Sequence, residues 1–362
     1  MERLVVGVVG AGTMGAGIAQ LALENGHEVV LHDVDDAAIE RGRARIREGL
    51  ARRAARLELD ADSIDEWVAG RLTSLRDAHS LDAVGAEAEV VIEAALEDLE
   101  LKRTIFRALD AATGPDVMLA TNTSALSVGS IATATTRPER VLGLHFFNPA
   151  PVMALVEVVR GASTDPSVIE RGATLMTAWG KTPVQCADSP GFIVNRVNRP
   201  FTVEALRMLE AGIASVEAID AALREAGFPL GPFELMDLAG VDINLAASAG
   251  IWEGLGRPDR LRPSALPERL VGEGRLGRKS GSGFYSYAGD RRGPVAPEFA
   301  GRATSVRPAE IRSRILAAID AEARFALDEG VATEHDIDLA MRLGAGHPSG
   351  PFERAAAPTI DR

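Results

Sequence analysis

The sequence predicts an α/β fold with a doubly wound sheet, followed by an all-α domain and an incomplete second copy of that helical domain. Strand-like and helical stretches alternate over residues 1–188, helical patterns dominate afterwards, and a set of residues recurs 118 positions later. Alternating strands and helices favour a mostly parallel sheet covered by helices.

Composition indicates a globular protein of two or three domains. The chain has 362 residues, of which 46% are hydrophobic and 25% charged, as in ordinary soluble proteins. The net charge of −13 disfavours nucleic acid and anionic membranes as partners. The single cysteine, Cys186, excludes a disulfide framework and a cysteine zinc site. No apolar run reaches the roughly 18 residues of a membrane span, so we expect a cytoplasmic enzyme without metal, membrane or nucleic-acid partner.

The first elements are a strand over residues 4–9, a glycine-rich turn, a helix and a second strand over residues 28–33. The turn reads Gly10-Ala11-Gly12-Thr13-Met14-Gly15. In this motif the first glycine permits a tight turn, the second lets the backbone approach a pyrophosphate, and the third allows close packing of helix on strand. The following helix points free N–H groups at the phosphates. The sequence therefore predicts a Rossmann-like, dinucleotide-binding domain.

An acid at the end of the second strand indicates which dinucleotide binds. Asp33 lies 18 residues after Gly15, near the roughly 20 expected for the acid that binds the adenosine ribose. A carboxylate there would repel a 2′-phosphate, and neither His32 nor Val34 supplies an arginine. The pattern favours NAD over NADP.

Further strands are predicted over 88–93, 116–121 and 141–145, with a helix over 99–112. The expected domains are an NAD-binding domain at 1–188, a helical domain at 189–287, a linker rich in Gly, Pro and Arg at 288–304, and a partial second helical copy at 305–362. The repeat behind the last assignment pairs residues 118 apart: Glu204 with Glu322, Gly212 with Gly330, and Asp220 with Asp338. A duplicated helical unit packed against its parent explains this pattern.

Oxidation of an alcohol by NAD needs a base for the hydroxyl proton. Histidine, with an ordinary pKa of about 6.5, is the first candidate. Of the six histidines, only His145 ends a predicted strand on the edge where open α/β sheets bind ligands. Taken alone, this position fits a catalytic base and a structural, hydrogen-bonded histidine equally well.

From about residue 3 to residue 287 the sequence resembles the 3-hydroxyacyl-CoA dehydrogenase family. Besides the glycine motif, the resemblance rests on Thr121-Asn122-Thr123-Ser124, His145-Phe146-Phe147-Asn148-Pro149, Leu155-Val156-Glu157, Asp188-Ser189-Pro190-Gly191 through Asn195-Arg196, Gly231-Pro232-Phe233-Glu234 and Leu276-Gly277-Arg278-Lys279. It implies an NAD-dependent oxidoreductase of fatty acid metabolism, in β-oxidation or short-chain acyl conversion.

The resemblance also implies roles for single residues. His145 would take the 3-hydroxyl proton while a hydride leaves C3 for the nicotinamide, and Glu157 would be its partner carboxylate. Ser124 and Asn195 would hydrogen-bond the substrate oxygen. The residues that would hold NAD, besides the glycine motif and Asp33, are Glu97, Lys102, Asn122, Asn148 and Lys279.

A local basic segment indicates which carrier holds the acyl group. Residues 40–57 contain seven arginines and two glutamates, and arginine forks suit phosphate oxygens. In the family this helical region meets CoA, which makes Arg52 and Arg56 candidate substrate ligands. CoA-specific relatives often carry serine where this chain has Gly49, and lysine where it has Arg56. A solvated charged helix face is the alternative.

The leading interpretation is an NAD-dependent (S)-3-hydroxyacyl-CoA dehydrogenase. One alternative is a dehydrogenase of the same family that acts on a carrier-protein-linked or free 3-hydroxy acid, and another is a non-catalytic NAD-binding scaffold. In the second copy, Ser313 stands at the position of Asn195, so that copy cannot repeat the chemistry. We expect either a homodimer or a pseudo-dimeric monomer built through the helical domains.

Overall fold

The computed structural model describes residues 2–301 and 303–356. The chain divides into two compact units between Asp188 and Ser189. In the described part, no helix combines the length and the apolar character that crossing a membrane requires.

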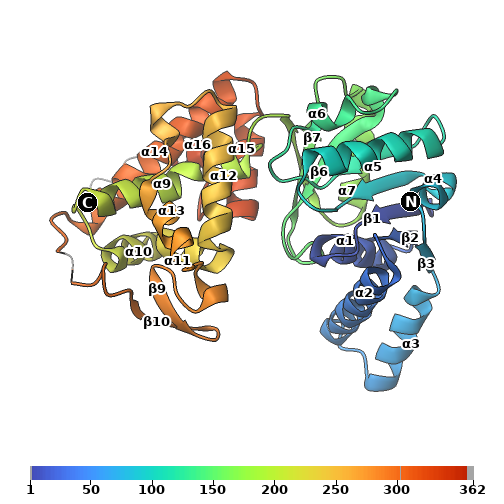
Figure 1. Ribbon diagram of the computed structural model, residues 1–362, viewed down its shortest axis with the longest axis horizontal. Coiled ribbons are helices and arrows are strands. Elements are labelled where there is room, and N and C mark those ends of the chain that lie inside the picture. Colours follow the sequence, from blue (N-terminus) through green and yellow to red (C-terminus); the bar gives the residue numbers. More distant parts are fainter. Residues whose placement is uncertain (1, 302, 357–362) are drawn as a thin grey trace. The chain divides into compact units, whose positions relative to one another are not determined.

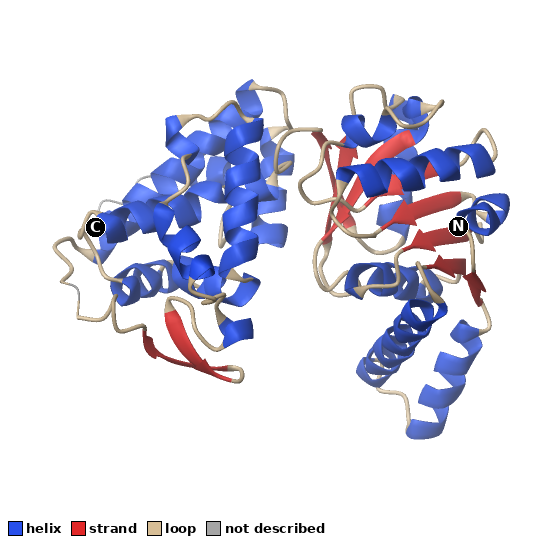
Figure 2. Cartoon of the chain, in the orientation of Figure 1, coloured by secondary structure: helices blue, strands red, loops and turns tan. Residues whose placement is uncertain are grey.

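An eight-stranded sheet with helices packed on it forms the first unit (Figure 2). The strand order is β3-β2-β1-β4-β5-β6-β7-β8, and neighbouring strands are parallel except for β6 and β7. The strands are β1 (Val5–Val9), β2 (Glu28–His32), β3 (Leu75–Ala78), β4 (Val90–Glu93), β5 (Met118–Thr121), β6 (Val141–Phe146), β7 (Leu155–Arg160) and β8 (Thr182–Ala187). The order reverses at β1, where the carboxyl ends of parallel strands open a ligand crevice.

The helices of the first unit follow the strands as the alternation predicts (Figure 1). They are α1 (Thr13–Glu24), α2 (Asp36–Arg56), α3 (Ala61–Leu72), α4 (Leu81–Glu87), α5 (Leu99–Ala112), α6 (Val128–Ala132) and α7 (Pro166–Ala178), with the 3-10 turn η1 (Pro138–Arg140). The central strands are apolar because both of their faces are covered: Val8 in β1 and Ile92 in β4 have no exposed surface.

The second unit is mainly helical, with one β-hairpin (Figure 2). Its elements are α8 (Val194–Val197), α9 (Arg199–Glu210), α10 (Val216–Glu225), α11 (Pro232–Ala239), α12 (Val241–Gly254), η2 (Asp259–Leu261), α13 (Ala265–Gly272), η3 (Arg278–Ser280), β9 (Tyr285–Ala288), β10 (Arg291–Val295), α14 (Pro308–Asp328), α15 (Glu334–Ala345) and α16 (Pro351–Ala356). The segment expected as a linker therefore contains β10, which pairs with β9 in an antiparallel ribbon.

The two helical copies contact each other reciprocally. Helix α14 packs on α9, and Arg196 of the first copy lies 2.9 Å from Glu322 of the second. The equivalent pair, with the copies exchanged, is Arg314 and Glu204 at 3.0 Å. A contact that repeats with its partners exchanged is typical of a two-fold interface, here contained within one chain.

The turn before α11 in the first copy is built like the turn before α16 in the second. Asp220 accepts a hydrogen bond from the backbone N–H of Phe233 at 2.9 Å, and Asp338 accepts one from that of Phe352 at 2.8 Å. The repeat found in the sequence thus corresponds to a repeated local structure. The last residues of the expected second copy, 357–362, lie outside the described residues.

Candidate active site

The glycine motif leaves open space where a ligand must approach. Gly10 has a φ of +99°, and a side chain there would come within 2.6 Å of the Ala94 carbonyl. At Gly15 a Cβ would lie 1.7 Å from the Gly10 carbonyl, so helix α1 packs directly on the turn. At Gly12, in contrast, a Cβ would meet nothing within 4 Å. The three glycines therefore serve the turn, the packing and an open cradle that suits a pyrophosphate.

The start of α1 and Asp33 complete this cradle. The N-cap residue of α1 is Gly12, which has no side chain to cap the first N–H groups of the helix. The helix N-terminus at Thr13 and Met14 can therefore bind phosphate. The Asp33 carboxylate accepts hydrogen bonds from the backbone N–H groups of Ala11 and Val34, both at 2.6 Å. These two bonds use half of its acceptor sites and leave capacity for ribose hydroxyls.

Glu97 organises the loop that follows β5. Its Oε1 accepts from the Thr123 hydroxyl at 2.6 Å and from the backbone N–H groups of Ser124 and Ala125 at 2.9 and 3.0 Å. Burial alone would raise the pKa of Glu97, but the Thr123 hydrogen bond, the Lys102 charge and the backbone N–H groups outweigh burial and lower it. The carboxylate is therefore held ionised beside Ser124.

Beneath this loop lies a buried ion pair that sequence reasoning missed. The Lys102 ammonium is 2.6 Å from Oε1 of Glu93 and 3.4 Å from Oε2 of Glu97. Glu93 has no exposed surface and also accepts from the Thr121 hydroxyl at 2.7 Å. The sequence signal for this ion pair was an acidic residue, Glu93, at the end of the apolar run 88–93. Lys102 thus contacts Glu97, which belongs to the expected cofactor site, and acts on that site indirectly.

The histidine singled out by position has a buried carboxylate partner. His145 and Glu157 are direct neighbours across the antiparallel pair of β6 and β7. Nδ1 of His145 lies 2.6 Å from Oε2 of Glu157, and the residues are 5% and 0% exposed. Next to them, the Asn122 side chain accepts from the backbone N–H of Phe146 at 2.9 Å, which ties the end of β5 to β6. This arrangement suits proton transfer at the second ring nitrogen.

Other histidines make structural contacts. The His27 ring accepts from the backbone N–H of Leu4 at 3.1 Å, and the ring of His32 is 2.9 Å from the Ala78 carbonyl. Neither lies beside a buried acid in the way that His145 does.

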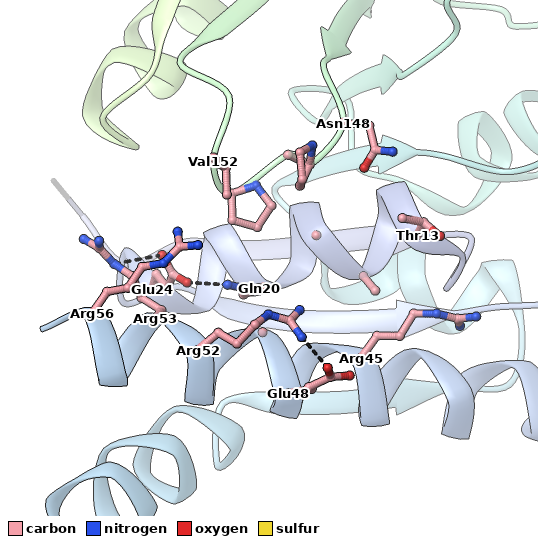
Figure 3. A pocket seen from close by; sticks show the side chains of 16 residues that line it. Thr13, Gln20, Glu24, Arg45, Glu48, Arg52, Arg53, Arg56, Asn148 and Val152 are labelled. Atoms are coloured by element: carbon pink, nitrogen blue, oxygen red, sulfur yellow. Dashed lines mark hydrogen bonds and ion pairs between the residues drawn. The ribbon is translucent and has the colours of Figure 1, made fainter. Parts of the chain in front are cut away.

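A groove of about 320 Å³ runs between α1, α2 and the loop after β6 (Figure 3). Its charged lining residues are Glu24, Arg45, Glu48, Arg52, Arg53 and Arg56, and Asn148 and Val152 face them from the loop. Arg52 pairs with Glu48, and Arg53 lies 3.8 Å from Glu24. Four of the seven arginines of this helix, Arg45, Arg52, Arg53 and Arg56, thus line a concave surface, although their side chains are also exposed to solvent.

Gly49 lies in this groove beneath the side chain of Gln20. A Cβ at position 49 would come within 1.9 Å of Gln20 Oε1. Gln20 is held there by a 2.6 Å hydrogen bond to Glu24. The amide group of Gln20 therefore fills the space in which a side chain at position 49 would lie.

Two of the expected site residues belong to the second unit. Asn195 lies in α8. Lys279 lies in η3, where its ammonium is 2.7 Å from the Asp242 carboxylate. The first unit brings together His145 with Glu157, and Ser124 with Glu97 and Lys102.

Comparisons with known proteins identify the family of this chain. Residues 5–189 match the model of the 3-hydroxyacyl-CoA dehydrogenase NAD-binding domain, and residues 191–287 and 311–361 match that of its C-terminal domain. A 3-hydroxyadipyl-CoA dehydrogenase of Escherichia coli K12 is 38% identical over 96% of this chain and 89% of its own. The human mitochondrial hydroxyacyl-coenzyme A dehydrogenase is 42% identical over 78% of this chain and 90% of its own.

A solved structure extends the likeness to three dimensions. The crystal structure of an E. coli 3-hydroxybutyryl-CoA dehydrogenase has a TM-score of 0.88 and 38% identity, covering 98% of this chain and 92% of that one. Together with the NAD cradle, these matches show that the chain belongs to the 3-hydroxyacyl-CoA dehydrogenase family of NAD-dependent oxidoreductases.

Proposed function

We propose that this enzyme oxidises the 3-hydroxyl group of (S)-3-hydroxyacyl-CoA thioesters, and reduces the 3-oxo group in the reverse direction. The buried hydrogen bond between His145 and Glu157 carries the proposal. A histidine at the ligand edge of the sheet, oriented by an enclosed carboxylate, fits a base for the substrate hydroxyl better than it fits a structural role.

His145 moves the proton. With Nδ1 directed at Glu157, the ring presents Nε2 for the 3-hydroxyl proton, and the carboxylate stabilises the imidazolium that forms. In the reductive direction the same nitrogen returns the proton to the oxygen. NAD, when bound, accepts the hydride from C3.

Ser124 and Asn195 position the substrate oxygen in this proposal. The backbone of Ser124 is held by Glu97, so the loop that carries the hydroxyl is fixed before substrate arrives. The NAD ligands would be Gly10, Ala11, Gly12, Thr13, Met14, Gly15, Asp33, Glu97, Asn122, Asn148 and Lys279, with Lys102 supporting Glu97.

The arginine groove favours CoA as carrier. Arg52 and Arg56 line it together with Arg45 and Arg53, and this cluster concentrates positive charge on a protein of net charge −13. Relatives are named for both 3-hydroxybutyryl-CoA and 3-hydroxyadipyl-CoA, so the acyl group varies while CoA is common to both names.

The test is NADH oxidation with acetoacetyl-CoA, run beside free acetoacetate. Turnover of the thioester that is lost in His145→Ala supports the proposal. Turnover of the free acid alone favours the alternative without CoA. Full activity in His145→Ala contradicts the mechanism. Arg52→Ala and Arg56→Ala should raise the KM for acetoacetyl-CoA, whereas Arg260→Ala, on a second-unit arginine paired with Glu322, should not.

We also propose that the domains are an NAD-binding domain at 1–188, a helical domain at 189–287, a connector at 288–304 and a partial helical copy at 305–362. The reciprocal pairs Arg196–Glu322 and Arg314–Glu204 support this division. The second copy would occupy the face of α9 on which another subunit could pack, giving a pseudo-dimeric monomer. We expect a sedimentation mass near 38 kDa. A dimer of twice that mass, formed through the same face of α9, would contradict this expectation.

A further inference from the structure

One buried cation of the second unit has no carboxylate partner among the described residues. Four cations are buried in the described part of the chain: Lys102, Lys181, Arg196 and Arg199. Lys102 is neutralised by Glu93, and Arg196 by Glu322 and Glu329. The Lys181 ammonium donates to two backbone carbonyls at 2.7 and 2.9 Å. Arg199 makes no ion pair with any described residue.

The guanidinium of Arg199 is poorly satisfied as well as unpaired. Its side chain donates to the Ser248 hydroxyl at 3.2 Å, while Nε has no partner in the described structure. Burial lowers the pKa of Arg199 to about 10, because no acid offsets the loss of water. A guanidinium carries five N–H donors, and burying such a charge without an anion is costly. Its position therefore calls for an anionic ligand.

The position of Arg199 relates it to the substrate. It follows Asn195 by four residues, about one helical turn or 6 Å of rise, and only Asn198, in the right-handed helical region, separates α8 from α9. Residues four apart lie on the same helical face. If Asn195 holds the C3 oxygen, substrate atoms near C3 lie within reach of Arg199, and the acyl chain beyond C3 is the part of the substrate that can supply an anion there.

Helix α12 provides a second polar surface beside this guanidinium. Ser248 is buried there, and the half-buried Asn244 lies one turn earlier on the same face. Hydroxyl and amide groups can donate to the same anion as the guanidinium. A carboxylate matches this set because its two oxygens suit the fork of an arginine.

Resting on the proposed function, we propose that Arg199 binds a carboxylate at the far end of the acyl chain, so that the preferred substrates are CoA thioesters of 3-hydroxy dicarboxylic acids. A plain alkyl chain in this position leaves the buried charge without an anion, and sites built to bind a polar group discriminate strongly against analogues that lack it. Arg199 is thus a specificity-determining residue, distinct from His145 and Glu157.

The test compares 3-hydroxyadipyl-CoA with (S)-3-hydroxyhexanoyl-CoA, which have the same chain length and differ in the terminal carboxylate. We expect the wild type to prefer the dicarboxylic substrate in kcat/KM by about 10- to 100-fold, mainly through KM. Arg199→Met should reduce this ratio to near one, and Arg199→Lys should restore part of it. Arg207→Met, on the same helix with Glu204 as partner, should keep the ratio.

Each outcome has one meaning. Equal turnover of both substrates by the wild type overturns the role of Arg199 and leaves the proposed function standing, whatever the variants do. Loss of both activities to the same extent in a folded Arg199→Met enzyme overturns it also, because a structural residue behaves in that way. Turnover of neither substrate by the wild type contradicts the proposed function itself.

Discussion

His145 and Glu157 face each other across the antiparallel junction of β6 and β7, with Nδ1 of the imidazole 2.6 Å from Oε2 of the carboxylate. We expect Glu157→Gln to lower kcat by roughly 100- to 10,000-fold, because an amide neither fixes the ring tautomer nor balances the imidazolium charge. Stopped-flow measurement of hydride transfer checks this expectation. NADH affinity serves as the control and should stay near the wild-type value, while an unchanged rate would contradict the assigned role.

Alanine substitutions in the glycine motif should separate binding from folding. Gly12→Ala places a methyl group into open space, so we expect weaker NADH binding at unchanged melting temperature. Gly15→Ala drives its Cβ into the Gly10 carbonyl, and should destabilise the fold by about 1–3 kcal/mol despite the better helix propensity of alanine. Fluorescence titration and thermal melts together provide the test. Identical behaviour of the two variants would disprove the division of roles.

Gly49 and Gln20 should be energetically coupled. Gly49→Ser must displace the Gln20 amide, which lies within 1.9 Å of the new Cβ, and this also disturbs its bond to Glu24. We expect the free energy of unfolding to fall in Gly49→Ser and to recover in the double variant with Gln20→Ala. A double-mutant cycle with a coupling energy of about 0.5–3 kcal/mol is the predicted result. Strictly additive effects would show that the two sites are independent.

His347 should make stability depend on pH. Burial, and then the positive charge of Arg354, lower the pKa of His347 to about 3. The unfolded chain binds this proton below pH 6.5 and the folded chain does not, so folding stability decreases as pH falls from about 6.5 towards 3. His347→Phe removes this contribution and should flatten the pH dependence by about 2 kcal/mol between pH 6.5 and 5.

Asp220 should change the folding stability in the opposite direction with pH. Burial raises its pKa to about 7, so the folded chain holds a proton that the unfolded chain has released, and its contribution weakens as pH rises from about 4 to 7. The two groups oppose each other in the wild type. Urea unfolding of wild type and His347→Phe at several pH values isolates the histidine, and parallel curves would contradict the prediction.

The two reciprocal ion pairs should differ in strength. Arg196 has no exposed surface and contacts two carboxylates, whereas the Arg314 side chain is 43% exposed. Arg196→Met leaves the buried Glu322 with one fewer cationic partner, so we expect the free energy of unfolding to fall by about 3–5 kcal/mol. Arg314→Met should cost about 1 kcal/mol or less. Equal losses in chemical denaturation would show that burial does not govern these pairs.

Much of the first unit was predictable because its signals are local. Apolar runs predict β1, β4, β5 and β6 to within two residues, and the predicted helix over 99–112 coincides with α5. The antiparallel direction of β7 was not predictable, since an apolar run does not encode strand direction. The contact of His145 with Glu157 depends on that direction, and before the structure it rested on resemblance alone.

Residues outside recognised motifs account for what sequence reasoning missed. Glu93 looks like one more strand residue until its partner Lys102, nine positions later, is placed beneath it. The role of Gln20 opposite Gly49 needs the packing of α1 on α2. In the expected linker, β10 has arginines and a proline in place of an apolar run, and only the backbone pairing with β9 reveals it as a strand.

Because both helical copies are part of one polypeptide, their sequences can differ. In a two-fold dimer every substitution appears in both subunits, so an aromatic residue close to the axis contacts the same residue of the other subunit. Here Phe228 meets His347, which stands 119 residues later, the same offset that relates Phe233 to Phe352; the two rings lie edge to face with centroids 4.8 Å apart. The covalent link thus allows the two copies to differ in sequence: the first carries Asn195, for which we propose a substrate contact, whereas the second carries Ser313 at that position and packs against the first.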